Sequence, residues 1–265
     1  MADPRSYLFV PGQRPDRFAK AAASGADAII LDLEDAVGPE QKDEARAHVA
    51  SWLADGGAGL VRINGQGTPW FDDDLAMLAC YAETAAMVPK AEPAALAAVA
   101  ARLPGRPLLA LIESAAGLAS AREGARAPGV ARLAFGNLDF SADMGMDPPD
   151  EGLDPARFEI VLASRLAGLP PPVDGVRVEL EDAAGLTAEV RRKRGLGFGA
   201  KLCIHPAQVG PVNAGFSPSA AEIDWARRIE AAMAEAAGSA VRVDGKMVDK
   251  PLLEKARRIL ANIPA

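Results

Sequence analysis

The sequence has few cysteines and no long apolar run. Two cysteines, Cys80 and Cys203, occur in 265 residues, both in apolar contexts and without CxxC spacing. This pattern predicts buried, reduced thiols rather than a disulfide or a metal site. No stretch approaches the roughly 18 uninterrupted apolar residues of a membrane span, and the N-terminus lacks the pattern of a secretory signal. We therefore expect a cytoplasmic protein with no membrane partner.

Positive charge is also scarce. The chain carries 29 Lys and Arg residues against 36 Asp and Glu residues, a formal net charge of −7. No basic block or basic-aromatic stripe is present, so nucleic acid is not an expected partner. Hydrophobic residues make up 49% of the chain, enough for a large core.

Short apolar runs recur, each followed by an Ala-rich helical segment. Because the runs are apolar throughout rather than alternating, they predict strands buried on both faces, as in a parallel sheet. Eight such β–α units in about 210 residues fit a (β/α)₈ TIM barrel, an α/β fold. A doubly wound sheet is the rival fold, although the first loop lacks GxGxxG. The expected strands are Tyr7–Val10, Ala28–Leu33, Leu60–Ile63, Ala85–Val88, Leu108–Ile112, Arg132–Phe135, Val173–Val178 and Ala200–Ile204.

Segments rich in Ala, Leu, Arg and Glu predict helices between these strands. They include Arg17–Ala23, Lys42–Ala54, Pro93–Ala101 and Leu118–Arg126. We expect a barrel domain over residues 1–212 and a C-terminal helical extension over residues 213–265. The extension would be a lid on the barrel or an arm that packs on a neighbouring subunit. Its expected parts are a helix Ala220–Ala237 capped by Ser217, a Val-rich segment Gly238–Val248 and a helix Pro251–Leu260.

The carboxyl ends of the strands build the active site of a TIM barrel. In this chain they carry many carboxylates, two arginines and one lysine, without a Cys/His cluster. This composition predicts a hard divalent cation on oxygen ligands, Mg²⁺ or equally Mn²⁺, rather than zinc. Glu113 and Asp139 follow neighbouring expected strands and can share one ion. The alternative is that each pairs with a basic residue or caps a helix.

Two basic residues at these strand ends suggest different chemistry. Arg62 closes the third expected strand, and its guanidinium can hold a substrate carboxylate by two bonds. The alternative for Arg62 is a salt bridge to Asp32 or Glu34 within the barrel mouth. Lys90 suggests a metal-free Schiff-base aldolase, but a metal-binding pair makes an imine superfluous.

The chain resembles citrate lyase β-subunit-like (CitE-like) proteins, which belong to the HpcH/HpaI aldolase superfamily with malyl-CoA and citramalyl-CoA lyases. The resemblance covers nearly the whole chain, and its combination of motifs is specific. The motifs are RSYLFVPGQRPDRFAKAAASGADAIILDLEDAV, VRING, VPKAE, LIESAAGL, AFGNLDFSADMG, KLCIHPAQV and GKMVDKPLLEKARRIL.

The resemblance implies a TIM barrel that assembles as a homotrimer or hexamer. It also implies Mg²⁺ on Glu113 and Asp139, with Arg62 and Glu113 next to the substrate. Coenzyme A, as part of the substrate, would lie near Arg14 and Lys20.

Three further positions follow from the same resemblance. Asp249 matches an acid that CoA-using relatives donate from a neighbouring subunit, although it also suits the N-cap of the last helix. Asp35 stands where aldolases of free oxo-acids carry a histidine, which favours the thioester-cleaving branch. Leu138 stands where many relatives carry a second acid, and this leaves the substrate class open.

We therefore expect a Mg²⁺-dependent carbon–carbon lyase acting on a 3-hydroxyacyl-CoA such as malyl-CoA or citramalyl-CoA. Arg62 would hold the oxo-acid, and Asp35 or Asp249 would transfer the proton. Thioester hydrolysis after cleavage is left open. The alternatives are an aldolase or hydrolase of a free oxo-acid or non-CoA ester, and a citrate lyase β subunit that acts only in a complex with an acyl carrier.

Overall fold

The computed structural model describes residues 3–236 and 240–263. Contacts divide the chain after Asn213, into a unit formed by Asp3–Asn213 and a second unit formed by Ala214–Ala265. None of the described helices combines the length and the apolar composition that a membrane crossing requires.

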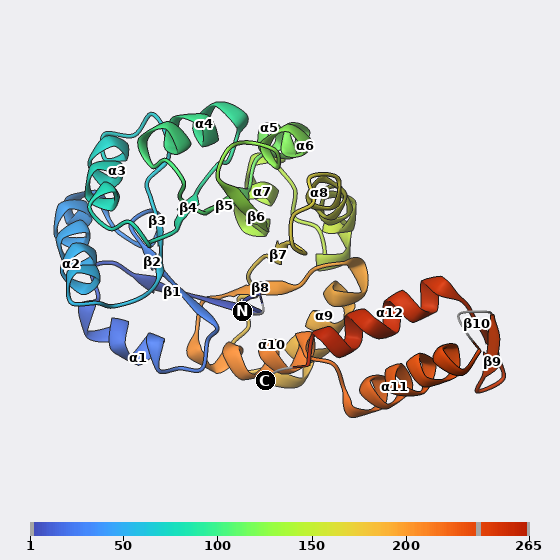
Figure 1. The fold of residues 1–265 in the computed structure, drawn as a ribbon. Helices are drawn as coiled ribbons and strands as arrows, with labels where there is room; N and C mark the ends of the chain where they lie inside the picture. Colours follow the sequence, from blue (N-terminus) through green and yellow to red (C-terminus); the bar gives the residue numbers. More distant parts are fainter. Residues whose placement is uncertain (1–2, 237–239, 264–265) are drawn as a thin grey trace. The chain divides into compact units, whose positions relative to one another are not determined.

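The first unit is a closed barrel of eight parallel strands, each paired with its neighbour in the sequence and the last paired with the first (Figure 1). The predicted TIM barrel is confirmed, and the doubly wound alternative is wrong because strands β1 and β8 pair with each other. The strands are β1 (Ser6–Pro11), β2 (Ala28–Asp32), β3 (Leu60–Arg62), β4 (Ala86–Val88), β5 (Leu108–Ile112), β6 (Val130–Phe135), β7 (Val173–Asp174) and β8 (Ala200–Cys203).

The interior of the barrel is filled by apolar side chains from the strands. Every residue of β5 is buried, which explains its uninterrupted apolar sequence. Leu109 and Leu111 of β5 belong to the inner cluster, two residues apart as strand geometry requires. The other buried members of this cluster are Tyr7, Ile30, Met87, Ala134, Val173, Ala200 and Leu202.

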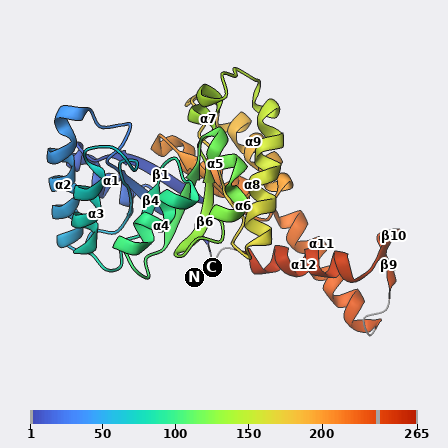
Figure 2. The same cartoon turned by 90° about the horizontal axis from the view of Figure 1, so that it is seen from above.

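Helices surround the barrel strands (Figure 1). Seen from the side, α7 lies beyond the end of β6, on the side of the strands' carboxyl ends (Figure 2). The helices are η1 (Pro15–Arg17), α1 (Phe18–Ala22), η2 (Pro39–Gln41), α2 (Lys42–Ala54), α3 (Phe71–Ala79), α4 (Pro93–Arg102), α5 (Ala115–Ala119), α6 (Ala121–Gly124), α7 (Asn137–Asp143), η3 (Asp150–Leu153), α8 (Asp154–Leu166), α9 (Ala183–Leu196), η4 (Pro206–Gln208) and α10 (Val209–Phe216).

Strand β7 is much shorter than predicted, because it ends at Asp174 rather than at Val178. The backbone N–H of Val176 donates to Oδ1 of Asn137 at 2.8 Å, and Nδ2 of Asn137 donates to the Val176 carbonyl at 3.1 Å. A side chain from α7 therefore takes the bonds that a continuing strand would need. Gly175 permits this approach, since a Cβ there would lie 2.0 Å from Oδ1 of Asn137.

The predicted helix Leu118–Arg126 is wrong in its start and in its continuity. Helix α5 begins at Ala115, where the Ser114 side chain accepts a capping bond from the N–H of Gly117. It ends at Ala119, before Ser120, whose backbone (ψ 7°) departs from helical values and whose hydroxyl donates to the carbonyl of Ala116 at 2.8 Å. Helix α6 starts after this break.

The described residues of the second unit form two helices and a hairpin after α10, namely α11 (Ala220–Glu235), β9 (Val241–Val243), β10 (Lys246–Val248) and α12 (Lys250–Ala261). Helices α11 and α12 pack along each other, with the hairpin at one end of the pair (Figure 2). The cap of α11 is Ser219 rather than the predicted Ser217, because Ser219 completes a capping box with Glu222. The predicted helix end at Ala237 and the start of the Val-rich segment at Gly238 lie outside the described residues.

Candidate active site

The register of the first three strands brings their final residues into one row. Pro11 lies beside Asp32, and Asp32 lies beside Arg62. On the other side of the barrel, Ile112 of β5 lies beside Phe135 of β6, so Glu113 and the start of α7 leave the barrel next to each other. Acidic and basic groups from four strands thus meet at the carboxyl ends of the strands.

Arg62 is buried and surrounded by carboxylates. Its Nε and Nη2 donate to both oxygens of Asp32 at 2.7 and 2.6 Å, and its Nη1 lies 2.9 Å from Oε2 of Glu34. The guanidinium also stacks over the ring of Phe9, 4.7 Å from the ring centroid. Burial acts to lower the pKa of Arg62, but these carboxylates outweigh it and raise the pKa above its ordinary value. The salt bridge that was one of two predictions for Arg62 is therefore formed.

Glu34 carries a strongly shifted carboxyl group. Burial raises its pKa to about 8, and the nearby charges of Glu113, Asp35 and Asp32 raise it as well, whereas Arg62 lowers it. Asp35 is more exposed, and its Oδ2 lies 3.5 Å from Nη1 of Arg62. Arg62 thus faces a buried acid with a raised pKa and a second acid that is open to solvent.

Glu113 is 3% exposed, and only one of its two carboxylate oxygens accepts a hydrogen bond from the described residues. Its Oε1 accepts the backbone N–H of Lys90 at 2.8 Å, whereas its buried Oε2 accepts no hydrogen bond from any described residue. Lys90 has a positive φ of 45°, which is uncommon for a residue with a Cβ. Burial raises the pKa of Glu113 to about 7, Asp139 contributes in the same direction, and the Lys90 N–H opposes the shift.

Asp139 lies in the first turn of α7 and is partly open to solvent. Partial burial and the charge of Asp35 raise its pKa, while Arg62 and Lys90 act to lower it. Gly136, which precedes α7, is packed against Glu113: a Cβ there would lie 2.5 Å from Cβ and 2.7 Å from Oε2 of Glu113. The absence of a side chain at Gly136 allows α7 to start this close to Glu113.

These groups suit a divalent cation. Carboxylates that raise one another's pKa indicate an excess of negative charge that a cation would relieve. The unpaired Oε2 of Glu113 offers a ligand oxygen next to the start of α7, which carries Asp139. Among the described residues no group of three or more His, Cys, Asp and Glu side chains is placed to hold a metal. An ion on Glu113 and Asp139 would therefore take its other ligands from water and substrate.

Comparison with known proteins identifies the family of the chain. The family model described as HpcH/HpaI aldolase/citrate lyase matches residues 5–206. The chain belongs to the HpcH/HpaI aldolase/citrate lyase family.

Members of this family that resemble the chain cover almost all of it. A (3S)-malyl-CoA thioesterase of Cereibacter sphaeroides is 41% identical over 98% of this chain and 95% of its own length. An L-malyl-CoA/β-methylmalyl-CoA lyase of the same species is 38% identical over 97% of this chain and 93% of its own length. The crystal structure of CitE from Mycobacterium tuberculosis in complex with magnesium, acetoacetate and coenzyme A matches with a TM-score of 0.88 and 35% identity, covering 98% of both chains. The predicted resemblance is confirmed.

The other residues predicted for the site have their own surroundings. Arg14 is paired with Asp16, with Nε and Nη2 donating to the two carboxylate oxygens at 2.8 Å. Lys20 is exposed in the last turn of α1. Asp249 belongs to the C-terminal unit, where it occupies the N-cap position of α12 without a side-chain capping bond. The roles predicted for these three residues remain predictions.

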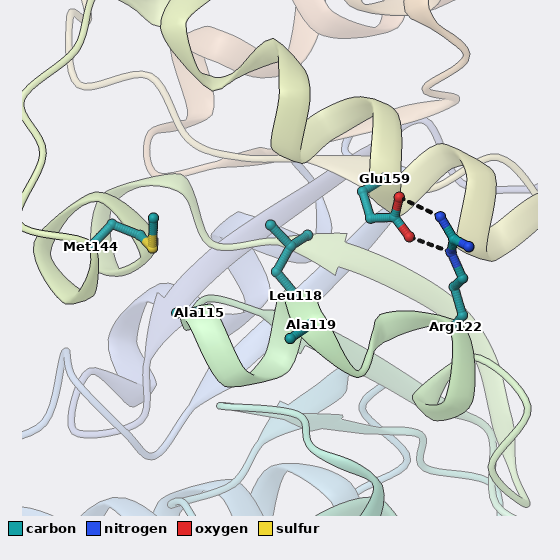
Figure 3. Close-up of a pocket in the computed structure, with 6 residues that line it drawn as sticks. All are labelled: Ala115, Leu118, Ala119, Arg122, Met144 and Glu159. Carbon is teal, nitrogen blue, oxygen red and sulfur yellow. Dashed lines mark hydrogen bonds and ion pairs between the residues drawn. The ribbon is translucent and has the colours of Figure 1, made fainter.

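A surface pocket of about 560 Å³ lies elsewhere on the barrel unit, between α5, α6 and α8 (Figure 3). An ion pair between Arg122 and Glu159 lines one side, and Leu118 and Met144 provide apolar walls. None of the carboxylates around Arg62 lines this pocket. We therefore place the candidate active site at the strand ends and not in this pocket.

Several residues around the site were not predicted from the sequence. Glu34 was considered only as a partner of Arg62, although a second acid in the run Asp32–Asp35 is a signal for a shifted carboxyl group. Lys90 was considered for its amine, whereas its backbone N–H is what contacts Glu113. Lys42 was treated as an ordinary helix residue, yet it is buried beside the acidic run.

Proposed function

We propose that this protein is a Mg²⁺-dependent carbon–carbon lyase that cleaves or forms a short 3-hydroxyacyl-CoA, with malyl-CoA or citramalyl-CoA as the substrate. The observation that carries the proposal is the half-satisfied, buried Glu113 beside Asp139 and the carboxylate-bound Arg62. Two relatives that match over nearly their full length are named for malyl-CoA chemistry, and the CitE structure was solved with magnesium and coenzyme A. These names support the substrate class.

Glu113 and Asp139 would hold the divalent cation, which supplies Lewis acidity at the oxygens of the oxo-acid half. Arg62 would bind the carboxylate of that half and add positive potential where negative charge develops. Its ion pairs with Asp32 and Glu34 keep the guanidinium in one orientation, so little side-chain freedom is lost when substrate binds.

The reaction requires two proton transfers. In the cleavage direction a base removes the proton of the 3-hydroxyl group, the bond between C2 and C3 breaks, and the electron pair moves to the thioester enolate. A proton is then returned to the enolate carbon, which gives the shorter acyl-CoA and the oxo-acid. Asp35, exposed and 3.5 Å from Arg62, is one candidate for this exchange through water. Asp249 of a neighbouring subunit is the other, with a carboxylate that makes no capping bond in its own helix.

A second candidate function is hydrolysis of the thioester. The (3S)-malyl-CoA thioesterase of Cereibacter sphaeroides, at 41% identity, specifically favours it. Both activities require that the malyl carboxylate be bound in the same way, but hydrolysis also requires a water molecule directed at the thioester carbon. The products distinguish them, since the lyase releases acetyl-CoA and glyoxylate from malyl-CoA and the thioesterase releases malate and free CoA.

The test is turnover of malyl-CoA and citramalyl-CoA, with products separated by chromatography, in the presence of Mg²⁺ or EDTA. We expect Mg²⁺-dependent formation of acetyl-CoA, and a loss of at least 10²-fold in kcat/KM for Asp139→Ala. Asp72→Ala is the matched control, because Asp72 is an acid in the first turn of α3 whose partner is the surface residue Arg102. Release of free CoA without acetyl-CoA would favour the thioesterase. Turnover in EDTA, or full activity of Asp139→Ala, would refute the proposed site.

The role of the C-terminal unit needs a separate experiment. If Asp249 acts in a neighbouring active site, Asp249→Ala mixed with Arg62→Ala should recover activity that neither variant has alone. The recovery requires subunits that exchange and an oligomer such as the expected homotrimer or hexamer. A monomeric protein in sedimentation, or no recovery after subunit exchange, would leave Asp35 as the candidate for the proton transfer.

A further inference from the structure

The acidic loop, residues 33–37, carries Glu34 and Asp35 and is held by side chains as well as by two backbone bonds, from the N–H of Leu33 to the Arg62 carbonyl and from the N–H of Val37 to the Glu34 carbonyl, each at 3.0 Å. The carboxylate of Asp32 accepts the backbone N–H groups of Glu34 at 2.9 Å and Ala36 at 3.2 Å. The carbonyls of Leu33 and Glu34 each accept a side-chain donor as well, and Glu34 does so in addition to its bond from Val37. The conformation of Glu34 thus depends on the groups that hold both sides of its backbone.

Lys42, the first residue of α2, supplies these donors. Its Nζ donates to the carbonyls of Leu33 and Glu34 and to Oδ1 of Asn64, each at 2.7 Å. An ammonium group has three N–H donors, so all of them are used. The side chain is 6% exposed, and Nζ lies 5.0 Å from the ring centroid of Trp70. Burial lowers the pKa of Lys42, while Asp32, Glu34 and Asp74 act to raise it.

A second set of bonds holds Asn64 in the orientation that Lys42 requires. Oδ2 of Asp74 accepts both the backbone N–H of Asn64 at 2.8 Å and its Nδ2 at 2.7 Å. Because the amide nitrogen faces Asp74, the amide oxygen must face Lys42. Asp74 is completely buried, and its other oxygen accepts Nε of Arg46 at 2.8 Å. Helices α2 and α3 and the segment that follows β3 therefore fix where Nζ of Lys42 lies.

We propose that Lys42 is a positioning residue, which holds the acidic loop so that Glu34 and Asp35 face Arg62 in the active site. The inference rests on the proposed function, since it assigns these acids to the same substrate site. Lys42 uses its three donors on the protein and touches no reacting atom. Its effect passes through the backbone of residues 33 and 34 to the carboxylates that surround the guanidinium.

The alternative is that Lys42 contributes only to stability, as any buried and fully bonded cation does. Arg106 provides a matched control for this alternative. It is also buried, at 7% exposure, and its Nη1 and Nη2 donate to the carbonyls of Thr84 and Leu78. It lies just before β5, at the amino ends of the strands and away from the site. Removing either cation takes a donor from two carbonyls, those of Leu33 and Glu34 for Lys42 and those of Thr84 and Leu78 for Arg106, and only the first two lie in the acidic loop.

The test compares Lys42→Met and Arg106→Met with wild type, using amide hydrogen exchange of peptides that cover residues 33–41 and steady-state kinetics on malyl-CoA with Mg²⁺. We expect Lys42→Met to accelerate exchange in the acidic loop and to lower kcat by about 10- to 100-fold. KM should change less than about threefold, because Asp32 still orients Arg62. Arg106→Met should leave both loop exchange and kcat unchanged, even if it unfolds at a lower temperature.

Lys42→Met with unchanged loop exchange and unchanged kcat would overturn the proposal. If Lys42→Met does not fold, Asn64→Ala, which removes one of the three acceptors, should shift both readouts in the same direction by a smaller factor. A wild-type protein that is inactive on both malyl-CoA and citramalyl-CoA would refute the proposed function alone. In that case loop exchange, which needs no substrate, decides whether Lys42 holds the acidic loop.

Discussion

Burial of Glu113 predicts that this protein is less stable at high pH than a variant in which the carboxylate is replaced by an amide. The pKa of Glu113 is raised from 4.5 to about 7 by burial. A carboxyl group with a raised pKa holds its proton in the folded state when the unfolded chain has lost it. The stability that the protonated Glu113 contributes to the folded state is therefore fully present below pH 4.5. It declines as the pH rises towards 7 and is lost above pH 7.

The size of this effect follows from the shift. The difference of 2.5 between the two pKa values, at about 1.4 kcal/mol per unit, corresponds to about 3 kcal/mol as an upper value. Glu113→Gln keeps an acceptor for the Lys90 N–H but carries no charge. We expect the variant to match wild type at pH 4.5 and to exceed its free energy of unfolding by about 1–3 kcal/mol at pH 8.5 in EDTA. The lower part of the range allows for the weaker bond to a neutral acceptor.

The assay is urea unfolding of both proteins at the two pH values, followed by far-ultraviolet circular dichroism. Glu159→Gln is the control, because the pKa of Glu159 is lowered by Arg122, so this variant should gain no stability at pH 8.5. Mg²⁺ adds a second readout: it should raise the melting temperature of wild type at pH 8.5 and leave that of Glu113→Gln unchanged. Equal stabilities of wild type and Glu113→Gln at both pH values would refute the reasoning.

Two further variants test the geometry of the site. Arg62→Lys keeps the charge, but a lysine cannot form two parallel hydrogen bonds to the oxygens of Asp32. We therefore expect kcat/KM on malyl-CoA to fall by at least about 10²-fold. Activity within about threefold of wild type would argue against a role for the guanidinium. Gly136→Ala places a Cβ 2.5 Å from Cβ of Glu113 and should destabilise the barrel by about 1–3 kcal/mol in urea unfolding. Gly124→Ala, whose Cβ would lie 3.4 Å from the nearest atom, should not do so.

Local sequence patterns are sufficient to predict the barrel and several of the residues at the carboxyl ends of its strands. The uninterrupted apolar run of β5 predicted a strand buried on both faces, and the structure has it at the predicted residues, Leu108–Ile112. Helix α2 also begins and ends where its composition predicted, at Lys42 and Ala54. Because the carboxyl ends of parallel strands meet at one end of a barrel, the sequence alone predicts that Arg62, Glu113 and Asp139 lie in one region.

Only the tertiary structure decided how these groups pair and titrate. The paired hydrogen bonds of Arg62 to Asp32 join residues 30 positions apart, and the pKa of Glu113 is raised by burial within the closed barrel and by the charge of Asp139. The early end of β7 likewise depends on Asn137, whose amide takes the backbone bonds of Val176. Local periodicity reports which side chains turn inward, since that depends on the geometry of a single strand or helix. Burial, charge pairing and hydrogen bonds from side chains to the backbone of another segment depend on parts of the chain that closure of the barrel brings together. These parts lie too far apart in the sequence for a local pattern to reveal their contacts.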